Sequence, residues 1–147
     1  MYMIFNTPFE NALRLLLLLS FYKEHMMSLD RLTALDFIAL YGRDLGVSPM
    51  SLNGQNTFSL CEYAAKRKLL HKAAKLLVLR GLIKAGENAK GFGYQITDLG
   101  SKTADGLDSD YAKEYRLALR FTEKYVEMPE WQLISWINRA AAEKVQG

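Results

Sequence analysis

The sequence predicts a mainly α-helical domain with one β-hairpin, and residues 69–99 give the reasons. Apolar residues recur there at three- and four-residue spacing, as on one face of a helix, and Gly81 then suits the left-handed conformation that often ends a helix. Two short segments at 82–85 and 94–97 flank a polar loop that contains glycine, which is typical of a hairpin. Helix, strand, wing loop and strand together are the second half of a winged helix. The apolar helix positions are Leu69, Ala73, Leu76 and Leu77, widened by Leu70 and Ala74, and the expected turn residues are Gly86, Asn88, Gly91 and Gly93.

Length and composition favour a single domain at 1–147. Of the 147 residues, 50% are hydrophobic and 24% are charged, so the chain can bury a core of its own. We expect the helices and the wing at 1–105 and a C-terminal helical extension at 106–147. The single cysteine, Cys61, cannot form an internal disulfide, which agrees with a reducing cytosol, and we interpret it as a small buried hydrophobe.

The apolar run at 13–21 is too short for a membrane span. Arg14 interrupts it and charged residues flank it, whereas a span needs about 20 apolar residues. No lysine or arginine precedes the run and no small-residue cleavage site follows it, so it does not resemble a signal peptide. We therefore expect a buried helix in a cytoplasmic protein that makes no membrane contact.

Two capped helices are predicted before the central stretch. Thr7, Pro8 and Glu10 form the start of a helix at 8–23. Because this helix is apolar on nearly all sides, we expect it at the centre of the core, or covered on its far face by the C-terminal helices or a partner. Ser28 caps a second helix that runs to about residue 40. Asp36 interrupts its apolar face, and we interpret this carboxylate as a hydrogen-bonding group rather than a catalytic one.

A loop at 41–57 and a third helix at 59–80 follow, the helix being either continuous or broken near Ala65. Glycine, proline and asparagine recur in the loop. Its length is unusual for an unstructured connection inside a compact domain, so we expect a partner to order part of it.

Further helices are predicted after the wing: a short one to Ala104, a long one at 110–126, and a last one that Pro129 opens. Trp131 and Trp136 lie on the last helix; such residues are more often core than contact surface, although interfaces favour aromatic side chains. The candidate caps of the first two helices are Thr97 or Asp98, and Asp108 or Ser109.

A partner is expected to dock on the 41–57 loop or on one of the terminal helices. Together with the first helix, these segments hold more apolar or irregular chain than one small domain readily covers, and exposed apolar patches mark interaction sites. The predicted partner-binding residues are Tyr41, Leu52, Asn53, Trp131 and Trp136.

The basic side of the protein is the third helix and its wing. Residues 60–90 hold eight basic and two acidic residues, a local net charge of +6, whereas the whole chain carries +3. Lys68, Lys72 and Lys75 form one stripe on the face away from the leucines, which is either a contact for phosphates or an acidic surface, or a solvated helix face. Direct base readout is less favoured, because the helix lacks Asn and Gln. The candidate contact residues are Lys66, Arg67, Lys68, Lys72, Lys75 and Lys90.

The sequence contains no pattern typical of a catalytic or metal site. His25 and His71 are far apart, and neither has a carboxylate or cysteine at ligand spacing. Phosphate-binding loop and nucleophile-elbow motifs are missing as well. We therefore expect a binding or adaptor protein without catalytic residues, metal or cofactor, and not an enzyme.

Several blocks, in this order, resemble the middle component of bacterial ABC-three-component systems. The chain is similar in particular to the small kleisin-like subunit of Lamassu-type anti-phage and anti-plasmid defence complexes, over about residues 7–140. The order and spacing of the blocks carry the resemblance. They are TPFENALRLLLLL, SLDRLTALDFIALYG, LVLRGLI with GYQITDLG, and DSDYAKEYRLAL.

This resemblance implies a non-enzymatic adaptor that bridges an SMC-like ABC ATPase and a nuclease-type effector, with DNA contacted through the complex. The ATPase and cutting activities would then belong to the other subunits. The alternative is a winged-helix DNA-binding transcriptional regulator. Such a regulator would dimerise to bind a two-fold site, with the helix at 110–126 as the interface.

Overall fold

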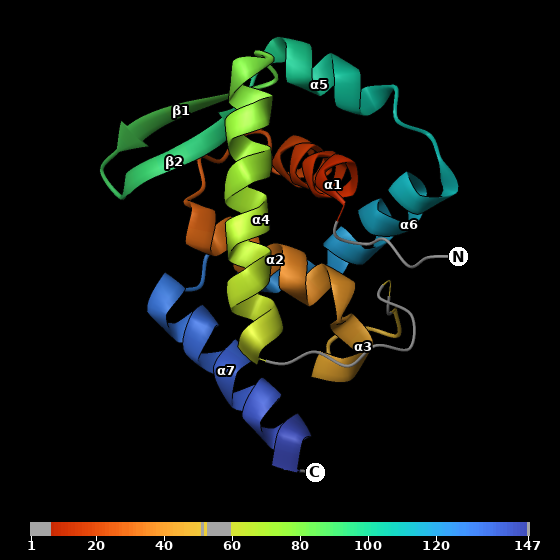
Figure 1. The fold of residues 1–147 in the computed structure, drawn as a ribbon, viewed down its shortest axis with the longest axis vertical. Helices are drawn as coiled ribbons and strands as arrows, with labels where there is room; N and C mark the ends of the chain where they lie inside the picture. The colour runs from red at the N-terminus through yellow and green to blue at the C-terminus, as the bar shows by residue number, and fades with distance from the viewer. Residues whose placement is uncertain (1–6, 51, 53–59, 147) are drawn as a thin grey trace.

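The structure is a computed structural model that describes residues 7–50, 52 and 60–146. Helix α4 (Leu60–Leu79) stands beside an antiparallel hairpin of β1 (Ile83–Asn88) and β2 (Gly91–Ile96), as Figure 1 shows. Behind α4 lies the central helix α1 (Pro8–Phe21), and this mainly helical arrangement with one hairpin confirms the predicted winged-helix-like fold. The other elements are α2 (Leu29–Leu40), α3 (Gly42–Leu45), α5 (Asp98–Asp105), α6 (Asp110–Leu119), the 3₁₀ helix η1 (Arg120–Tyr125) and α7 (Glu130–Gln146).

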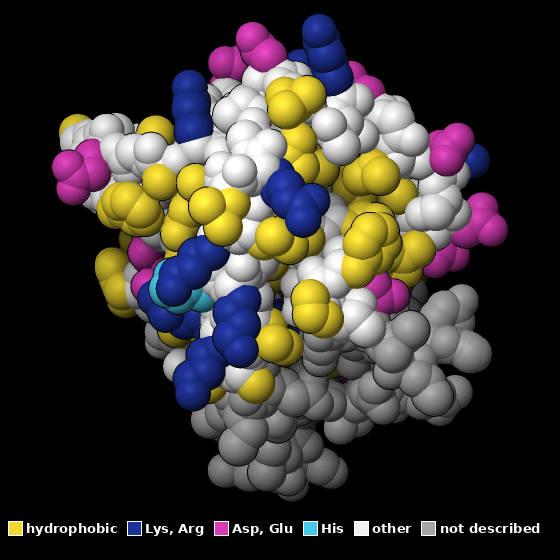
Figure 2. All heavy atoms as spheres, turned by 45° about the horizontal axis from the view of Figure 1, so that its top comes forward, with side chains coloured by type: hydrophobic (Ala, Val, Ile, Leu, Met, Phe, Trp, Pro, Cys, Tyr) yellow, Lys and Arg dark blue, Asp and Glu magenta, His cyan; other side chains and the backbone are white. Residues whose placement is uncertain are grey.

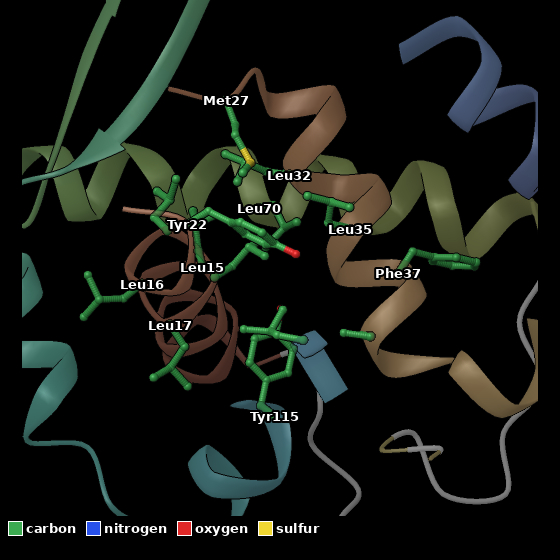
Figure 3. Packing of buried hydrophobic residues seen from close by; sticks show 14 of the residues in the cluster. Leu15, Leu16, Leu17, Tyr22, Met27, Leu32, Leu35, Phe37, Leu70 and Tyr115 are labelled. Atoms are coloured by element: carbon green, nitrogen blue, oxygen red, sulfur yellow. The ribbon is translucent and has the colours of Figure 1, made fainter. Parts of the chain in front are cut away.

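Helix α1 is the predicted core helix, and the chain itself covers it. The Glu10 N–H donates to the Thr7 hydroxyl at 3.1 Å, which confirms the cap, and the helix ends at Phe21, two residues earlier than expected. Residues 15–19 are buried, because α2, α4, α5 and α6 all pack against α1. Figure 3 shows Leu15 of α1 and Leu70 of α4 among the buried residues of the interior. Of the expected alternatives, cover by other helices of the chain is therefore the one observed.

The segment between α1 and α2 adds an unpredicted backbone pairing to the hairpin. The Met27 N–H donates to the Tyr94 carbonyl at 2.9 Å, and the Tyr94 N–H donates to the Met27 carbonyl at 2.8 Å. Directly after this bridge, the Ser28 hydroxyl accepts from the Arg31 N–H, which confirms the expected cap of α2. The hairpin is thus anchored to the first half of the chain.

The hairpin is longer than predicted and its turn is tighter. Ala85 pairs with Tyr94, as expected, but Gly86 and Gly93 also pair with each other and so belong to the strands, not to the turn. Gly93 lies there because a side chain would overlap Met26 and the Met27 backbone. Between α4 and β1, Gly81 adopts φ +75°, which confirms the predicted helix end.

The described part of the predicted 41–57 loop, residues 41–50 and 52, is ordered by the chain's own bonds, and the ordering of the rest by a partner stays a prediction. Gly42–Leu45 forms the short helix α3. The Arg43 N–H donates to the Met50 carbonyl at 2.8 Å, and the Leu52 N–H donates to the Leu40 carbonyl at 3.1 Å. Residues 51 and 53–59 lie outside the described residues. Helix α4 then runs without a break at Ala65.

The predicted long helix at 110–126 is two elements. Ser109 caps α6, and Thr97 caps the short helix α5, so one of the two expected candidates is confirmed in each case. After Leu119 the chain tightens into η1, where the Thr122 hydroxyl donates to the Leu119 carbonyl at 2.6 Å. The Tyr22 hydroxyl lies 2.6 Å from the same Thr122 hydroxyl and ties η1 to the end of α1. A side-chain bond to a backbone carbonyl competes with the regular helical pattern here.

Candidate interaction surfaces

A buried polar cluster fixes the helices against one another. The Arg14 guanidinium of α1 donates to the Asp36 carboxylate of α2 at 2.9 Å, and the Tyr115 hydroxyl of α6 donates to it at 2.6 Å. All three side chains are buried. Burial alone would raise the pKa of Asp36, but Arg14, Lys66 and the two hydrogen bonds hold that pKa below its usual value. The carboxylate is therefore a structural hydrogen-bonding group, as the sequence indicated.

Lys66 belongs to this cluster, which corrects its assignment to the contact surface. Its side chain is only 3% exposed, and its Nζ lies 4.0 Å from the Asp36 carboxylate. Four helices therefore meet at one carboxylate, because α4 contributes Lys66. The sequence held a signal for this, since Arg14 and Asp36 each interrupt an otherwise apolar helix, but the pairing across 22 residues was not predicted.

The predicted stripe of Lys68, Lys72 and Lys75 lies on the exposed face of α4. Figure 2 shows Lys and Arg side chains gathered along this face, with hydrophobic side chains beside them. Arg67, next to the stripe, is half-exposed and binds the Asp30 carboxylate of α2 at 2.6 Å. The stripe therefore offers three cations to an acidic ligand, and Arg67 is already paired within the chain.

Lys90 is separate from this stripe. It lies in the turn of the hairpin, where its N–H donates to the Asn88 side chain at 2.8 Å. Together with His25, Arg31 and Glu127 it lines a cleft of about 370 Å³, and none of the stripe lysines lines that cleft. The structure thus does not bring all the predicted basic residues to one site.

The predicted partner-binding residues have different environments. Trp131 is 73% exposed at the start of α7, whereas Trp136 is half-buried and stacks on Tyr125 with ring centres 5.0 Å apart. Tyr41 is buried against Phe37, which corrects its assignment to a contact surface. Leu52 is half-buried against the core, and Asn53 lies outside the described residues. Trp131 is thus the most accessible of the four predicted partner residues that the structure describes.

Sequence reasoning missed the apolar end of α4. Leu76 was expected on the buried face, yet it is exposed, as are Val78 and Leu79. The buried face is instead formed by Leu70, Ala73, Ala74 and Leu77, together with Tyr63 and Lys66.

The described residues contain neither a membrane-spanning helix nor a metal-binding cluster. No helix among them combines the length and hydrophobicity that crossing a bilayer requires. The same residues contain no group of three or more His, Cys, Asp or Glu side chains placed to hold a metal ion.

Comparison with known proteins gives one family and no individual relative. No curated protein and no solved structure matches the chain. The family model that matches is that of ABC-three component (ABC-3C) system Middle Component 2, and the match spans residues 4–147. Since this is nearly the whole chain, the protein belongs to the Middle Component 2 family of ABC-three-component systems.

Proposed function

We propose that this protein is a non-enzymatic adaptor subunit of a bacterial anti-phage or anti-plasmid defence complex. In this proposal it bridges an SMC-like ABC ATPase and a nuclease-type effector, as the small kleisin-like subunit of a Lamassu-type complex would. The observation that carries the proposal is the family match over residues 4–147, since a middle component works together with the other components of its system.

The surface supports a bridging role. A bridge needs at least two contact surfaces, and the described residues offer candidates on two different helices. One is the basic stripe on α4, and the other is the exposed Trp131 on α7. Aromatic anchors of this kind contribute strongly to protein interfaces. The apolar run at residues 15–19 of α1 is not needed for docking, because the chain's own helices cover it.

Co-expression with the other two components of the same system tests the proposal. The components are purified through a tag on the ATPase, with and without this chain, and the mass of the complex is measured in solution. The adaptor role predicts one complex that contains all three chains, and an ATPase and effector that separate when this chain is omitted. Direct association of ATPase and effector without this chain would contradict the bridging role.

The alternative is a winged-helix transcriptional regulator, and the exposed lysine stripe beside a hairpin wing favours it. Its expected dimer helix is shorter than the sequence indicated, because α6 ends at Leu119 and buries Tyr115 and Ala118 inside the domain. A stable dimer that footprints a two-fold symmetric DNA sequence would support the regulator and exclude the adaptor.

A further inference from the structure

The last turns of α4 and the face of the hairpin next to them enclose an apolar groove. Its volume is about 370 Å³, within the range of roughly 300–1,000 Å³ that is common for binding pockets. Its lining combines one cation with five apolar or aromatic side chains. We call this hollow the α4–hairpin groove. It is lined by Lys75, Val78 and Leu79 of α4 and by Ala85, Phe92 and Tyr94 of the hairpin.

Large hydrophobic side chains are unusually exposed at this groove. Leu79 is 84% exposed and Phe92 is 54% exposed, and Leu76 and Val78 are exposed beside them. Figure 2 shows hydrophobic side chains on this side of the molecule among the lysines of α4. A contiguous apolar patch of this kind marks an interaction site, whereas single exposed apolar residues do not.

The geometry of the hairpin explains both the hollow and its wall. Cross-strand partners share one face of a hairpin, so Ala85 lies beside Tyr94 on the face toward the groove. The small Ala85 leaves space there. Phe92 is held at the edge by Tyr94, whose ring packs edge to face with it at 5.4 Å and 83°. Phe92 and Tyr94 thus form one packed wall of the groove.

Charge indicates the kind of segment that the groove binds. Lys75 lines the groove, and Lys72 and Lys68 continue the positive charge along the same face of α4. Glu87, the cross-strand partner of Phe92, is the one acidic residue of the two strands and does not line the groove. A ligand with apolar side chains toward the groove and carboxylates toward α4 complements this pattern.

We propose that the α4–hairpin groove binds an acidic amphipathic helix of a partner protein. Such a helix presents apolar residues at three- and four-residue spacing to a groove, and its acidic residues would meet the lysine stripe. A protein fits better than DNA, because DNA interfaces are polar and basic, and do not call for large exposed hydrophobic residues. The inference requires a protein partner but not the defence complex proposed above, so either can fail alone.

Peptide selection on the full chain tests this inference even while the partner is unidentified. Random peptides of about 16 residues, roughly four helical turns, are selected on the immobilised protein. The affinity of each enriched peptide is then measured by fluorescence anisotropy. Enriched peptides should carry apolar residues at helical spacing with Asp or Glu between them.

Variants then locate the binding site. Leu79→Ser and Phe92→Ser should each weaken binding at least about tenfold, and Lys75→Glu should weaken it as well. The matched controls are Phe9→Ser on α1 and Leu117→Ser on α6, which change the same residue types at exposed positions outside the groove lining. These controls should bind within about twofold of the wild type. Circular dichroism confirms that each variant folds. Because the Leu79 side chain is 84% exposed, Leu79→Ser should disturb folding least.

Three results would overturn the inference. The selection could enrich no peptide above background, or only peptides that bind the Leu79→Ser and Phe92→Ser variants as tightly as the wild type. A DNA duplex could also bind the wild type and lose affinity in both variants, which would assign the groove to nucleic acid.

Discussion

Two regions of this small domain differ in how much of their apolar surface the chain itself covers. We call the packed surroundings of α1 the closed side, and the outer face of α4 with the hairpin the open side. Helix α1 carries the longer apolar run, yet α2, α4, α5 and α6 cover it. Helix α4 carries far more charge, yet it leaves Leu76, Val78 and Leu79 in solvent. Apolar content along the chain therefore does not tell where a partner is needed. What decides is which faces the chain itself covers.

Lys66 and Lys68 show the same contrast for charge. They are two residues apart on α4, but Lys66 is buried against Asp36 and Lys68 is exposed. Substitutions on the closed side around α1 should therefore lower stability, and substitutions on the open side should change binding alone. The following changes test this division, from the largest expected effect on stability to the smallest.

Asp36→Ala should lower the free energy of unfolding by about 3–5 kcal/mol, because it leaves Arg14 buried without its carboxylate. Urea denaturation measures the change. The matched control is Arg67→Ala, which breaks the partly exposed pair with Asp30 and should cost less than about 1 kcal/mol. Similar losses in both variants would remove the distinction between the closed and the open side.

Gly100→Ala should lower the free energy of unfolding by about 1–3 kcal/mol. Gly100 lies in α5 so close to the segment between α4 and β1 that an added Cβ would overlap the Leu82 carbonyl oxygen. Thermal unfolding of Gly106→Ala provides the control, since a Cβ has room at Gly106 and its φ of −84° suits alanine. That variant should match or exceed the wild type in stability. A Gly100→Ala protein as stable as the wild type would show that α5 is not closely packed there.

Tyr22→Phe should lower the free energy of unfolding by about 1 kcal/mol, because it removes the hydroxyl that bonds to Thr122. Equilibrium denaturation measures it. An unchanged stability would mean that this contact does not hold η1 to α1.

Low pH should lower the free energy of unfolding through protonation of Asp36 on the closed side. The pKa of this carboxyl in the folded protein is held below its usual value of 3.8. The ionised carboxylate therefore stabilises the folded state, and this stabilisation is fully present above pH 3.8. The contribution is lost as the pH falls through the folded pKa. Stability measured from pH 6 to pH 2 should therefore drop less steeply in Asp36→Asn than in the wild type, although this variant starts lower. Parallel curves for the two proteins would contradict the assignment.

Replacement of Lys68, Lys72 and Lys75 by glutamate should leave stability within about 0.5 kcal/mol of the wild type, because all three are exposed. If the stripe contacts DNA in the assembled complex, the variant should bind DNA more weakly and with a smaller salt dependence. Binding that is unchanged at low salt would identify these lysines as a solvated face.

Local patterns predicted most of the fold because each acts over a few residues. The caps Thr7, Ser28 and Ser109 and the helix end at Gly81 are fixed by short-range geometry. The errors came from long-range contacts. Thr122 meets Tyr22 across 100 residues, and that contact accompanies the division of the predicted long helix.

The candidate surface was less predictable for the same reason. The stripe follows from helical spacing, but the burial of Lys66 depends on Asp36, 30 positions earlier on another helix. The α4–hairpin groove depends on where the hairpin folds relative to Leu79, which no spacing within α4 specifies.

Hydrogen exchange on the isolated protein and on the complex with its two partner components tests most directly whether the open side is completed by a partner. If a partner completes this side, protection should rise on assembly at the end of α4, in the hairpin or at the start of α7 near Trp131. Protection in α1 should be high already and should not change. Complete protection of all these segments in the isolated protein, with no rise on assembly, would show that no partner completes this side.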